Sequence, residues 1–370
     1  MSKPYISNFV VLRPPYETSQ EEGLEWLAQA HTQSEVFSQG AALDRESFCG
    51  GIRTALQKVG CKPEHIRRRG HIIADFLHRE WSRMDLYRLS ESAVGATLSI
   101  RQAIFEKWAD SLFEQYYPNA ENPPEDLIHV TCTGYVAPSS AQKRVAQLRW
   151  PTSVTHAYHM GCYAAIPALR IAEGYLAAAL QKRRVDIVHT EGCTLHLNPA
   201  LHQVDQFVTQ SLFADGSIRY SIVREESPGS MVLLSSYDAI LPDSATAMTW
   251  NPSGFGFLMS LSKEIPVYIL RNIESVVRKL GCSSWKNVLF AIHPGGPKII
   301  SYIQKALELE DAQVAHSRHI LYNYGNMSSA TLPHVWKAIC DDPTIPVGTP
   351  VVSLAFGPGL SIWSALMEKR

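Results

Sequence analysis

The sequence predicts an α/β fold, in which buried strands and helices alternate along the chain. Two short apolar runs, residues 185–191 and 286–292, have the length and β-branched content of buried strands. Residues 162–180 are almost continuously small or apolar, and a helix that is apolar on most sides is a buried one. We therefore expect this helix in the centre of the molecule.

Composition narrows the class of protein. The 370 residues, 45% of them hydrophobic, suffice for a large core and fit two domains or one doubled domain. A formal net charge of −1 gives no reason to expect a nucleic-acid or membrane partner. The seven cysteines are odd in number and irregularly spaced, which is typical of reduced thiols. Residues 1–9 lack an apolar signal core and no run reaches membrane-spanning length, so we expect a cytoplasmic protein.

The same patterns predict each element in turn, although no strong internal repeat is visible. The first part should contain a strand at 6–12, helices at 20–38, 46–59 and on to about 117, a strand at 126–132, the helix at 162–180, and strands at 185–191, 217–224 and 230–239. The second part should contain helical structure at 252–284, a strand at 286–292, helices at 298–309 and 331–340, and a hairpin of 351–356 with 360–366.

Cys162 stands at the start of the predicted central helix, after a glycine that allows a tight turn. Unpaired backbone N–H groups and the positive end of the helix dipole favour a thiolate at this position. Pro167 lacks an N–H group, so the helix should begin irregularly. The alternative is an inert buried cysteine, because Cys is among the most buried residue types.

Two further polar positions lie where α/β folds place chemistry, at strand ends and helix starts. His293 directly follows the strand at 286–292. Asn326 opens a polar cluster before the helix at 331–340, where it is either a helix cap or a functional amide. Cys162, His293 and Asn326 are therefore candidate catalytic residues.

Four segments that contain these residues resemble the signature segments of chalcone-synthase-like type III polyketide synthases, condensing enzymes of the thiolase superfamily. They are Gly161-Cys162, residues 292–297 (IHPGGP), residues 324–329 (YGNMSS) and residues 356–360 (FGPGL). The resemblance runs from about residue 5 to the C-terminus. It implies a thiolase fold with duplicated βαβαβ halves in a five-layered αβαβα arrangement. The half at 1–240 would carry the nucleophilic cysteine, and the half at 241–370 would carry His and Asn.

The resemblance also implies a chemistry. A Claisen condensation needs a nucleophile that holds one acyl group as a thioester, and Cys162 suits this task. His293 would hold Cys162 as a thiolate by ion pairing and, with Asn326, would donate hydrogen bonds to the thioester oxygen. No metal or redox cofactor is expected, and the substrates would be linked to coenzyme A or to the phosphopantetheine of an acyl carrier protein.

Other positions acquire a role only through the resemblance. Phe213 matches a gatekeeper aromatic of the family, although an ordinary core Phe is an equal alternative, and Met259 falls near a second gatekeeper. Cys193 and His196 could suggest a metal pair, but two ligands are poor evidence for zinc. The pocket would be lined by Thr133, Glu191, Cys193, His196, Phe213, Met259 and Ser328. The basic residues Lys62, Arg67 and Arg68 would meet the phosphates of the carrier, or form a solvated face.

The loop that follows the strand at 126–132 would reach toward the second subunit of a homodimer. Ala137 in this loop, His196 and Met259 depart from the plant pattern, so we hypothesise an α-pyrone or related short polyketide. It would form by iterative malonyl extension or by joining two β-ketoacyl chains.

Three alternatives stay open at this point. A Cys protease also uses Cys, His and Asn in this chain order, but its local signature is absent and Cys162 lies mid-chain. A hydrolase with a Gly-x-Ser-x-Gly elbow is not indicated. A non-catalytic subunit that binds an acyl carrier would not need to retain the three candidate residues.

Overall fold

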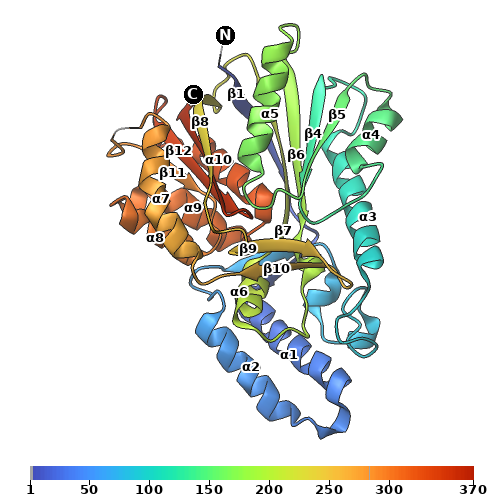
Figure 1. The fold of residues 1–370 in the computed structure, drawn as a ribbon. Coiled ribbons are helices and arrows are strands. Elements are labelled where there is room, and N and C mark those ends of the chain that lie inside the picture. Colours follow the sequence, from blue (N-terminus) through green and yellow to red (C-terminus); the bar gives the residue numbers. More distant parts are fainter. Residues whose placement is uncertain (1–2, 283) are drawn as a thin grey trace.

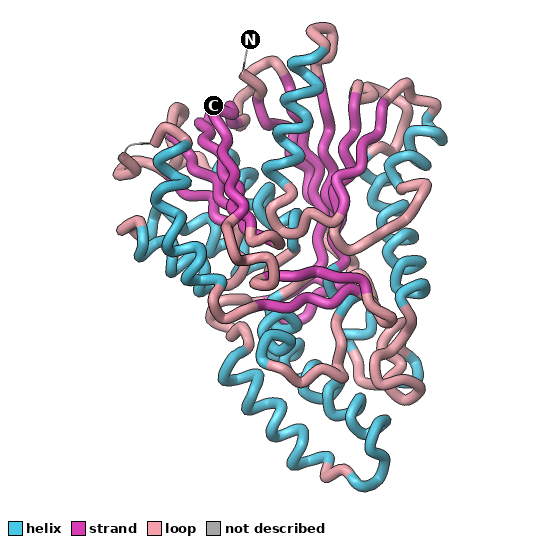
Figure 2. Tube along the Cα trace, viewed as in Figure 1, coloured by secondary structure: helices cyan, strands magenta, loops and turns pink. Residues whose placement is uncertain are grey.

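The computed structural model describes residues 3–282 and 284–370 and confirms the predicted α/β class. A mixed sheet of nine strands crosses the molecule in the order β11-β12-β13-β8-β1-β7-β6-β4-β5 (Figures 1 and 2). Its strands are β1 (Tyr5–Leu12), β4 (Asp126–Thr131), β5 (Ser153–Tyr158), β6 (Arg184–Gly192), β7 (Asp215–Val223), β8 (Met231–Ile240), β11 (Leu289–Ile292), β12 (Pro350–Gly357) and β13 (Ser361–Lys369). Two small sheets are formed by β2 (Tyr16–Ser19) with β3 (Arg68–His71) and by β9 (Met248–Pro252) with β10 (Phe257–Leu261).

Helices cover this sheet in layers. They are α1 (Gln20–Gln39), α2 (Arg45–Val59), α3 (Leu98–Tyr116), α4 (Ser140–Leu148), α5 (Ala165–Ala178), α6 (Val204–Leu212), α7 (Ile265–Lys279), α8 (Pro297–Ala306), α9 (Asp311–Tyr324) and α10 (Thr331–Asp341). Figure 1 shows α5 and α10 between the two wings of the sheet, α3 and α4 outside one wing, and α7 and α8 outside the other. This is the layered arrangement of a thiolase fold.

The wings are joined mainly by packing. Strand β1 meets β8 over only two residue pairs, Tyr5 with Val232 and Ile6 with Met231. The central apolar cluster, in contrast, takes residues from both halves, among them Leu169 on α5 and Trp336 on α10. Burial of this shared surface therefore holds the two wings together.

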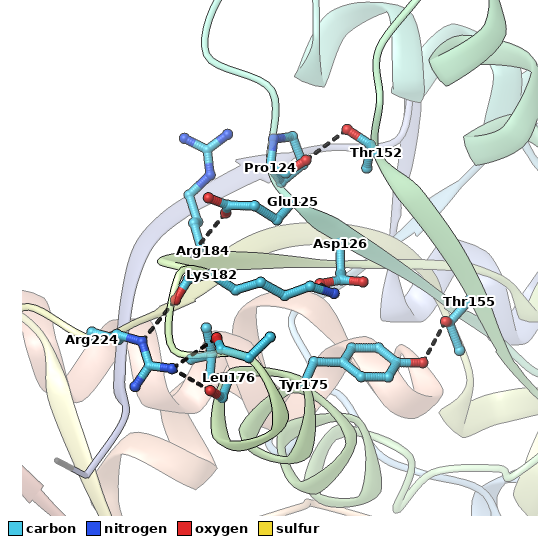
Figure 3. A network of polar contacts seen from close by, with 11 residues as sticks. Pro124, Glu125, Asp126, Thr152, Thr155, Tyr175, Leu176, Lys182, Arg184 and Arg224 are labelled. Atoms are coloured by element: carbon cyan, nitrogen blue, oxygen red, sulfur yellow. Dashed lines mark hydrogen bonds and ion pairs between the residues drawn. The ribbon is translucent and has the colours of Figure 1, made fainter. Parts of the chain in front are cut away.

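The central helix is close to the prediction, and its ends are clearly defined. It begins at Ala165 rather than at Cys162, and Pro167 lies in its first turn, as the expected irregular start requires. At its other end, the Arg224 guanidinium donates to the carbonyl oxygens of Leu176 and Ala179, and to that of Lys182 at 2.7 Å. Figure 3 shows this cap beside the ion pair of Lys182 with Asp126. Arg224 thus satisfies carbonyls that the helix itself leaves unpaired.

One expected element is wrong in part. Residues 252–284 were predicted to be helical, but α7 occupies only 265–279, and 257–261 form strand β10. The Ser253 hydroxyl bonds with the backbone of Gly256 and closes the turn between β9 and β10. Pairing of Phe257 with Pro252 and of Met259 with Trp250 then fixes a hairpin, which local apolar periodicity does not distinguish from a helix. The edge strand β5 was also missed.

None of the described helices combines the length and apolar composition needed to span a bilayer.

Candidate active site

Cys162 lies in the tight turn that connects β5 to α5. Gly161 has a φ of +80°, a conformation that strongly favours glycine, and a Cβ atom there would lie 2.9 Å from the Pro358 ring. The Cys162 side chain is 7% exposed, so its sulfur is reached only through the interior of the protein. Because Gly161 has no side chain, the Pro358 ring packs directly against the turn that carries Cys162, which is called the nucleophile turn below.

Strand β12 contacts both His293 and a residue next to Cys162. The backbone N–H of His293 donates to the Leu354 carbonyl at 2.7 Å, and β11 and β12 are parallel neighbours. Farther along β12, a Cβ atom on Gly357 would overlap the Tyr163 ring, so only glycine fits this contact. One strand of the second half therefore contacts His293 and Tyr163, the residue that follows Cys162.

Asn326 reaches the same place from α9. Its backbone pairs with the segment after α6: its N–H donates to the Leu212 carbonyl at 3.1 Å, and its carbonyl accepts from the Ala214 N–H at 2.9 Å. Its side-chain oxygen accepts from the Ser328 N–H at 2.9 Å, which leaves the amide NH2 group for Cys162. A hydrogen bond from this amide is one of the effects that favour the Cys162 thiolate. Asn326 therefore serves both the turn and the nucleophile.

Burial dominates the electrostatics of the site. It raises the pKa of Cys162 to about 12, against the opposing effect of the Ser328 hydroxyl, whose oxygen is 3.6 Å from the sulfur. Burial also lowers the pKa of His293 to about 3. The expected dipole effect on the thiol is thus outweighed, and the resting pair is a neutral thiol and a neutral imidazole.

His293 has unused hydrogen-bonding capacity. Among the described residues, neither of its ring nitrogens has a hydrogen-bond partner, although the side chain is only 1% exposed. Buried polar atoms without partners are rare and often mark a functional site. A neutral imidazole here can donate one hydrogen bond and accept one.

A narrow pocket lies beside this site and shares Ser328 with it, although Cys162, His293 and Asn326 do not themselves line it. The free space among its walls is only about 30 Å³. It is lined by Cys132, Thr133, Cys193, His196, Leu197, Gln206, Thr209, Gln210, Phe213, Trp250, Phe257, Met259 and Ser328. The structure brings together every predicted pocket residue except Glu191, which lies buried behind the wall and bonds with Cys132 and Thr133. Trp250 and Phe257 were missed, because their hairpin was read as helical.

His196 links two segments of the pocket wall by hydrogen bonds. Its Nε2 donates to the Thr133 carbonyl at 2.8 Å, and its Nδ1 accepts from the Phe257 N–H at 3.1 Å. The ring also stacks on Phe257 with centroids 4.5 Å apart. Because both nitrogens are engaged, His196 offers no ligand that would pair with Cys193 on a metal. No cluster of three or more potential metal ligands occurs among residues 3–282 and 284–370.

Comparison with known proteins supports the resemblance. Residues 232–369 match the model of the chalcone and stilbene synthase C-terminal domain. The resemblance read from the four motifs is thereby confirmed. Probable polyketide synthase 1 of Dictyostelium discoideum is 33% identical over 256 residues, which are 65% of this chain but only 8% of that protein.

Solved structures of polyketide synthases share the whole fold. The C-terminal type III polyketide synthase domain of Steely1, a type I/III hybrid from Dictyostelium, has a TM-score of 0.81 at 22% identity, with 99% of both chains covered. PKS-I of the brown alga Ectocarpus siliculosus has a TM-score of 0.82 at 20% identity, covering 100% of this chain and 99% of that one. Tetrahydroxynaphthalene synthase of Streptomyces coelicolor has a TM-score of 0.79 at 20% identity, with 99% of both chains covered.

The basic residues proposed to meet the carrier differ in exposure. Lys62 and Arg67 are exposed, whereas Arg68 is half-buried and paired with Glu17 at 3.1 Å. The neighbouring Arg69 is fully buried, and its Nη1 donates to the carbonyl oxygens of Gln210 and Phe213 at 2.8 and 2.9 Å. The sequence does not predict this role of Arg69, because the buried carbonyls that it binds lie far away in the chain.

Proposed function

We propose that the protein is a condensing enzyme that joins acyl thioesters by Claisen condensation through an acyl-Cys162 intermediate. The observation that carries the proposal is the contact of the Ser328 hydroxyl with the Cys162 sulfur at 3.6 Å, two residues after Asn326, whose amide lowers the pKa of the same thiol. The match of residues 232–369 to the chalcone and stilbene synthase C-terminal domain supports the same interpretation.

In the first step, the Cys162 sulfur attacks the carbonyl carbon of an acyl thioester, and the thiol of coenzyme A or phosphopantetheine leaves. The Cys162 proton passes to the neutral His293 imidazole and from there to the leaving sulfur. The free NH2 group of Asn326 and a protonated His293 nitrogen would donate to the carbonyl oxygen as it gains negative charge. Burial strengthens these hydrogen bonds, because few water molecules compete with them.

In the second step, a carbon nucleophile forms on the other thioester, either by loss of CO2 from a malonyl group or by loss of a proton from a β-ketoacyl chain. This carbon attacks the acyl group on Cys162, a carbon–carbon bond forms, and the Cys162 thiolate leaves. Phe213 lines the pocket and would disfavour a bare carboxylate beside it, which assists decarboxylation.

We further propose a short product, such as an α-pyrone. Trp250, His196 and Phe257 fill the pocket and leave space for about one water molecule, so a long chain needs a displaced wall. Met259 is the wall residue best suited to move, because its side chain is flexible. Once Met259 has moved, an enol oxygen of a short β-ketoacyl chain could close a pyrone ring.

A homodimer is the proposed assembly. Strand β5 lies at the edge of the large sheet, and an unpaired edge is a template for another strand. The adjacent loop carries Tyr135, whose large side chain is 45% exposed. Both features lie beside the nucleophile turn, so a second copy of the chain would cover one side of the site.

Acyl transfer to Cys162 is tested by intact-protein mass spectrometry after incubation with an acyl-CoA. The unmodified protein should gain the mass of one acyl group, and Cys162→Ala should gain none. Cys340→Ala is the matched control, since Cys340 is another buried cysteine far from the pocket. A gain of the acyl mass by Cys162→Ala would overturn the proposal. Acylation of the unmodified protein without any condensation product would favour a carrier-binding subunit.

The route is tested by product analysis in two incubations, one with acyl-CoA and malonyl-CoA and one with two β-ketoacyl carrier proteins. Products in the first incubation indicate iterative extension. Products only in the second exclude it and indicate chain joining. Peptide cleavage without carbon–carbon bond formation would favour the protease alternative.

A further inference from the structure

A directed chain of buried hydrogen bonds ends on Glu191, behind the pocket wall. The Tyr220 hydroxyl lies 3.1 Å from His189 Nε2, and His189 Nδ1 lies 3.0 Å from the Ser329 hydroxyl oxygen. Ser329 in turn donates to the Glu191 carboxylate. All four side chains are fully buried, so water does not supply alternative partners. The protons must therefore be distributed among these groups alone.

While Glu191 is ionised, the number of protons available allows the hydrogen bonds of this chain to point in only one direction. The single proton of Ser329 goes to the carboxylate, so the Ser329 oxygen must accept from His189 Nδ1–H. Burial lowers the pKa of His189 to about 3, so its ring is neutral and its Nε2 accepts from the Tyr220 hydroxyl. His189 and Ser329 each donate once and accept once, and every proton of the chain has an acceptor. A protonated Glu191 would instead donate to Ser329 and reverse the chain, so that His189 Nε2–H donates to Tyr220 and the Tyr220 proton is left without an acceptor among the described residues.

On its other side, Glu191 accepts from donors at the end of β4 and in the loop that follows it. They are the Cys132 N–H at 3.1 Å, the Thr133 hydroxyl at 2.9 Å, the Cys132 thiol at 3.4 Å and the Thr131 hydroxyl at 3.5 Å. These bonds favour the carboxylate, whereas burial favours the acid and raises the pKa of Glu191 to about 7. Because burial and hydrogen bonding nearly balance at neutral pH, the loss of one hydrogen-bond donor would change the charge of Glu191.

The charge of Glu191 is felt at the nucleophile. The Cys132 sulfur lies 3.0 Å from the Ser328 hydroxyl oxygen, which also contacts Cys162. The negative charge of Glu191 raises the pKa of the Cys162 thiol, and those of the Cys132 and Cys193 thiols. The residues that face His189 from β4 and α10 are His129 and His334, and burial keeps both neutral.

We propose that His189 is a positioning residue that acts through Ser329 to hold Glu191 ionised, and that it thereby sets the acidity of the Cys162 thiol. This inference rests on the proposed function, because it takes Cys162 to be the nucleophile. His189 itself touches no pocket space, since it lies on the far side of Glu191 and Ser329.

The test is the pH dependence of Cys162 alkylation by iodoacetamide, followed by mass spectrometry of the Cys162 peptide. His189→Leu removes the donor to Ser329, so Glu191 should lose charge near neutrality and the alkylation midpoint should fall by roughly 0.5 to 1 pH unit. His189→Asn is the matched control, because its amide N–H replaces Nδ1–H, and it should restore the unmodified profile. Tyr220→Phe removes only the outer donor and should give a smaller shift in the same direction.

The variant Glu191→Gln isolates the effect of the Glu191 charge. In Glu191→Gln the side chain is uncharged at every pH, so the addition of His189→Leu should cause no further shift. Coincident profiles for the folded His189→Leu and unmodified proteins would overturn the inference, and so would a His189→Leu shift that persists in Glu191→Gln. Alkylation needs no acyl substrate. A failure to form condensation products would therefore reject the proposed function. The alkylation profiles would still show whether His189 affects the acidity of Cys162.

Discussion

Asn326 uses the two ends of its amide for different purposes. Its oxygen fixes the turn by accepting from the Ser328 N–H, and its amide is one of the effects that lower the pKa of the Cys162 thiol. From the sequence, a helix cap and a functional amide were competing interpretations. The two are compatible, because a side-chain amide carries a donor and an acceptor on one planar group.

This division predicts the behaviour of Asn326→Asp. The carboxylate can still accept from Ser328, so the fold should be retained, but the donor to the reacting oxygen is lost and a charge is added beside the sulfur. Acyl transfer in single-turnover assays should fall about 100- to 1000-fold. Asn323→Asp, three residues earlier on α9, is the control and should remain active. A fully active Asn326→Asp would remove Asn326 from the catalytic group.

Glu191 predicts a pH-dependent stability. Its folded pKa of about 7 lies above the ordinary value of 4.5, so the folded state binds the proton more tightly than the unfolded state. Its contribution is therefore present below about pH 4.5 and is lost as the pH rises toward 7, by up to about 3 kcal/mol. Urea unfolding at pH 5 and pH 8 should show this loss in the unmodified protein and a smaller loss in Glu191→Gln. An equal loss in both proteins would contradict it.

Among the elements, those governed by local pattern were predictable and those governed by distant contacts were not. The central helix was evident, because its apolar residues are continuous in the sequence. The hairpin of β9 and β10 was not, because His196, from a different part of the chain, holds Phe257 in place. The same reason hid the roles of Arg69 and His189, whose partners are remote in sequence.

Strand β7 predicts a sensitive position at Gly216. A Cβ atom there would overlap the Met327 side chain, which directly follows Asn326. Gly216→Ala should therefore lower stability by about 1 to 3 kcal/mol and reduce acyl transfer. Gly174→Ala on α5 is the matched control: nothing lies within 4 Å of its Cβ position, so it should add roughly 0.5 to 1 kcal/mol. Melting curves and acylation rates of both variants check the contrast.

At the scale of the whole molecule, the motifs placed three catalytic candidates correctly on strand ends and turns, but they gave no view of how the halves join. The structure supplies that view: β8 pairs along its length with β13, and the central cluster draws on both halves. The halves at 1–240 and 241–370 therefore share one sheet and one core.

A shared core predicts one cooperative unfolding transition. Neither half should persist alone, because each would expose the apolar surface of α5 or α10. Unfolding curves from tryptophan fluorescence and from far-ultraviolet circular dichroism should coincide. Two separated transitions would show that the halves are independent domains.

The two ends of α5 are both held, by Arg224 at the carbonyl end and by Pro358 against Gly161 at the other. The turn that carries Cys162 is therefore held in place at the start of this helix. Under the proposed function, an acyl chain that grows on a stationary sulfur would have to extend away from it. The space between Trp250 and Met259 would then limit the length of that chain.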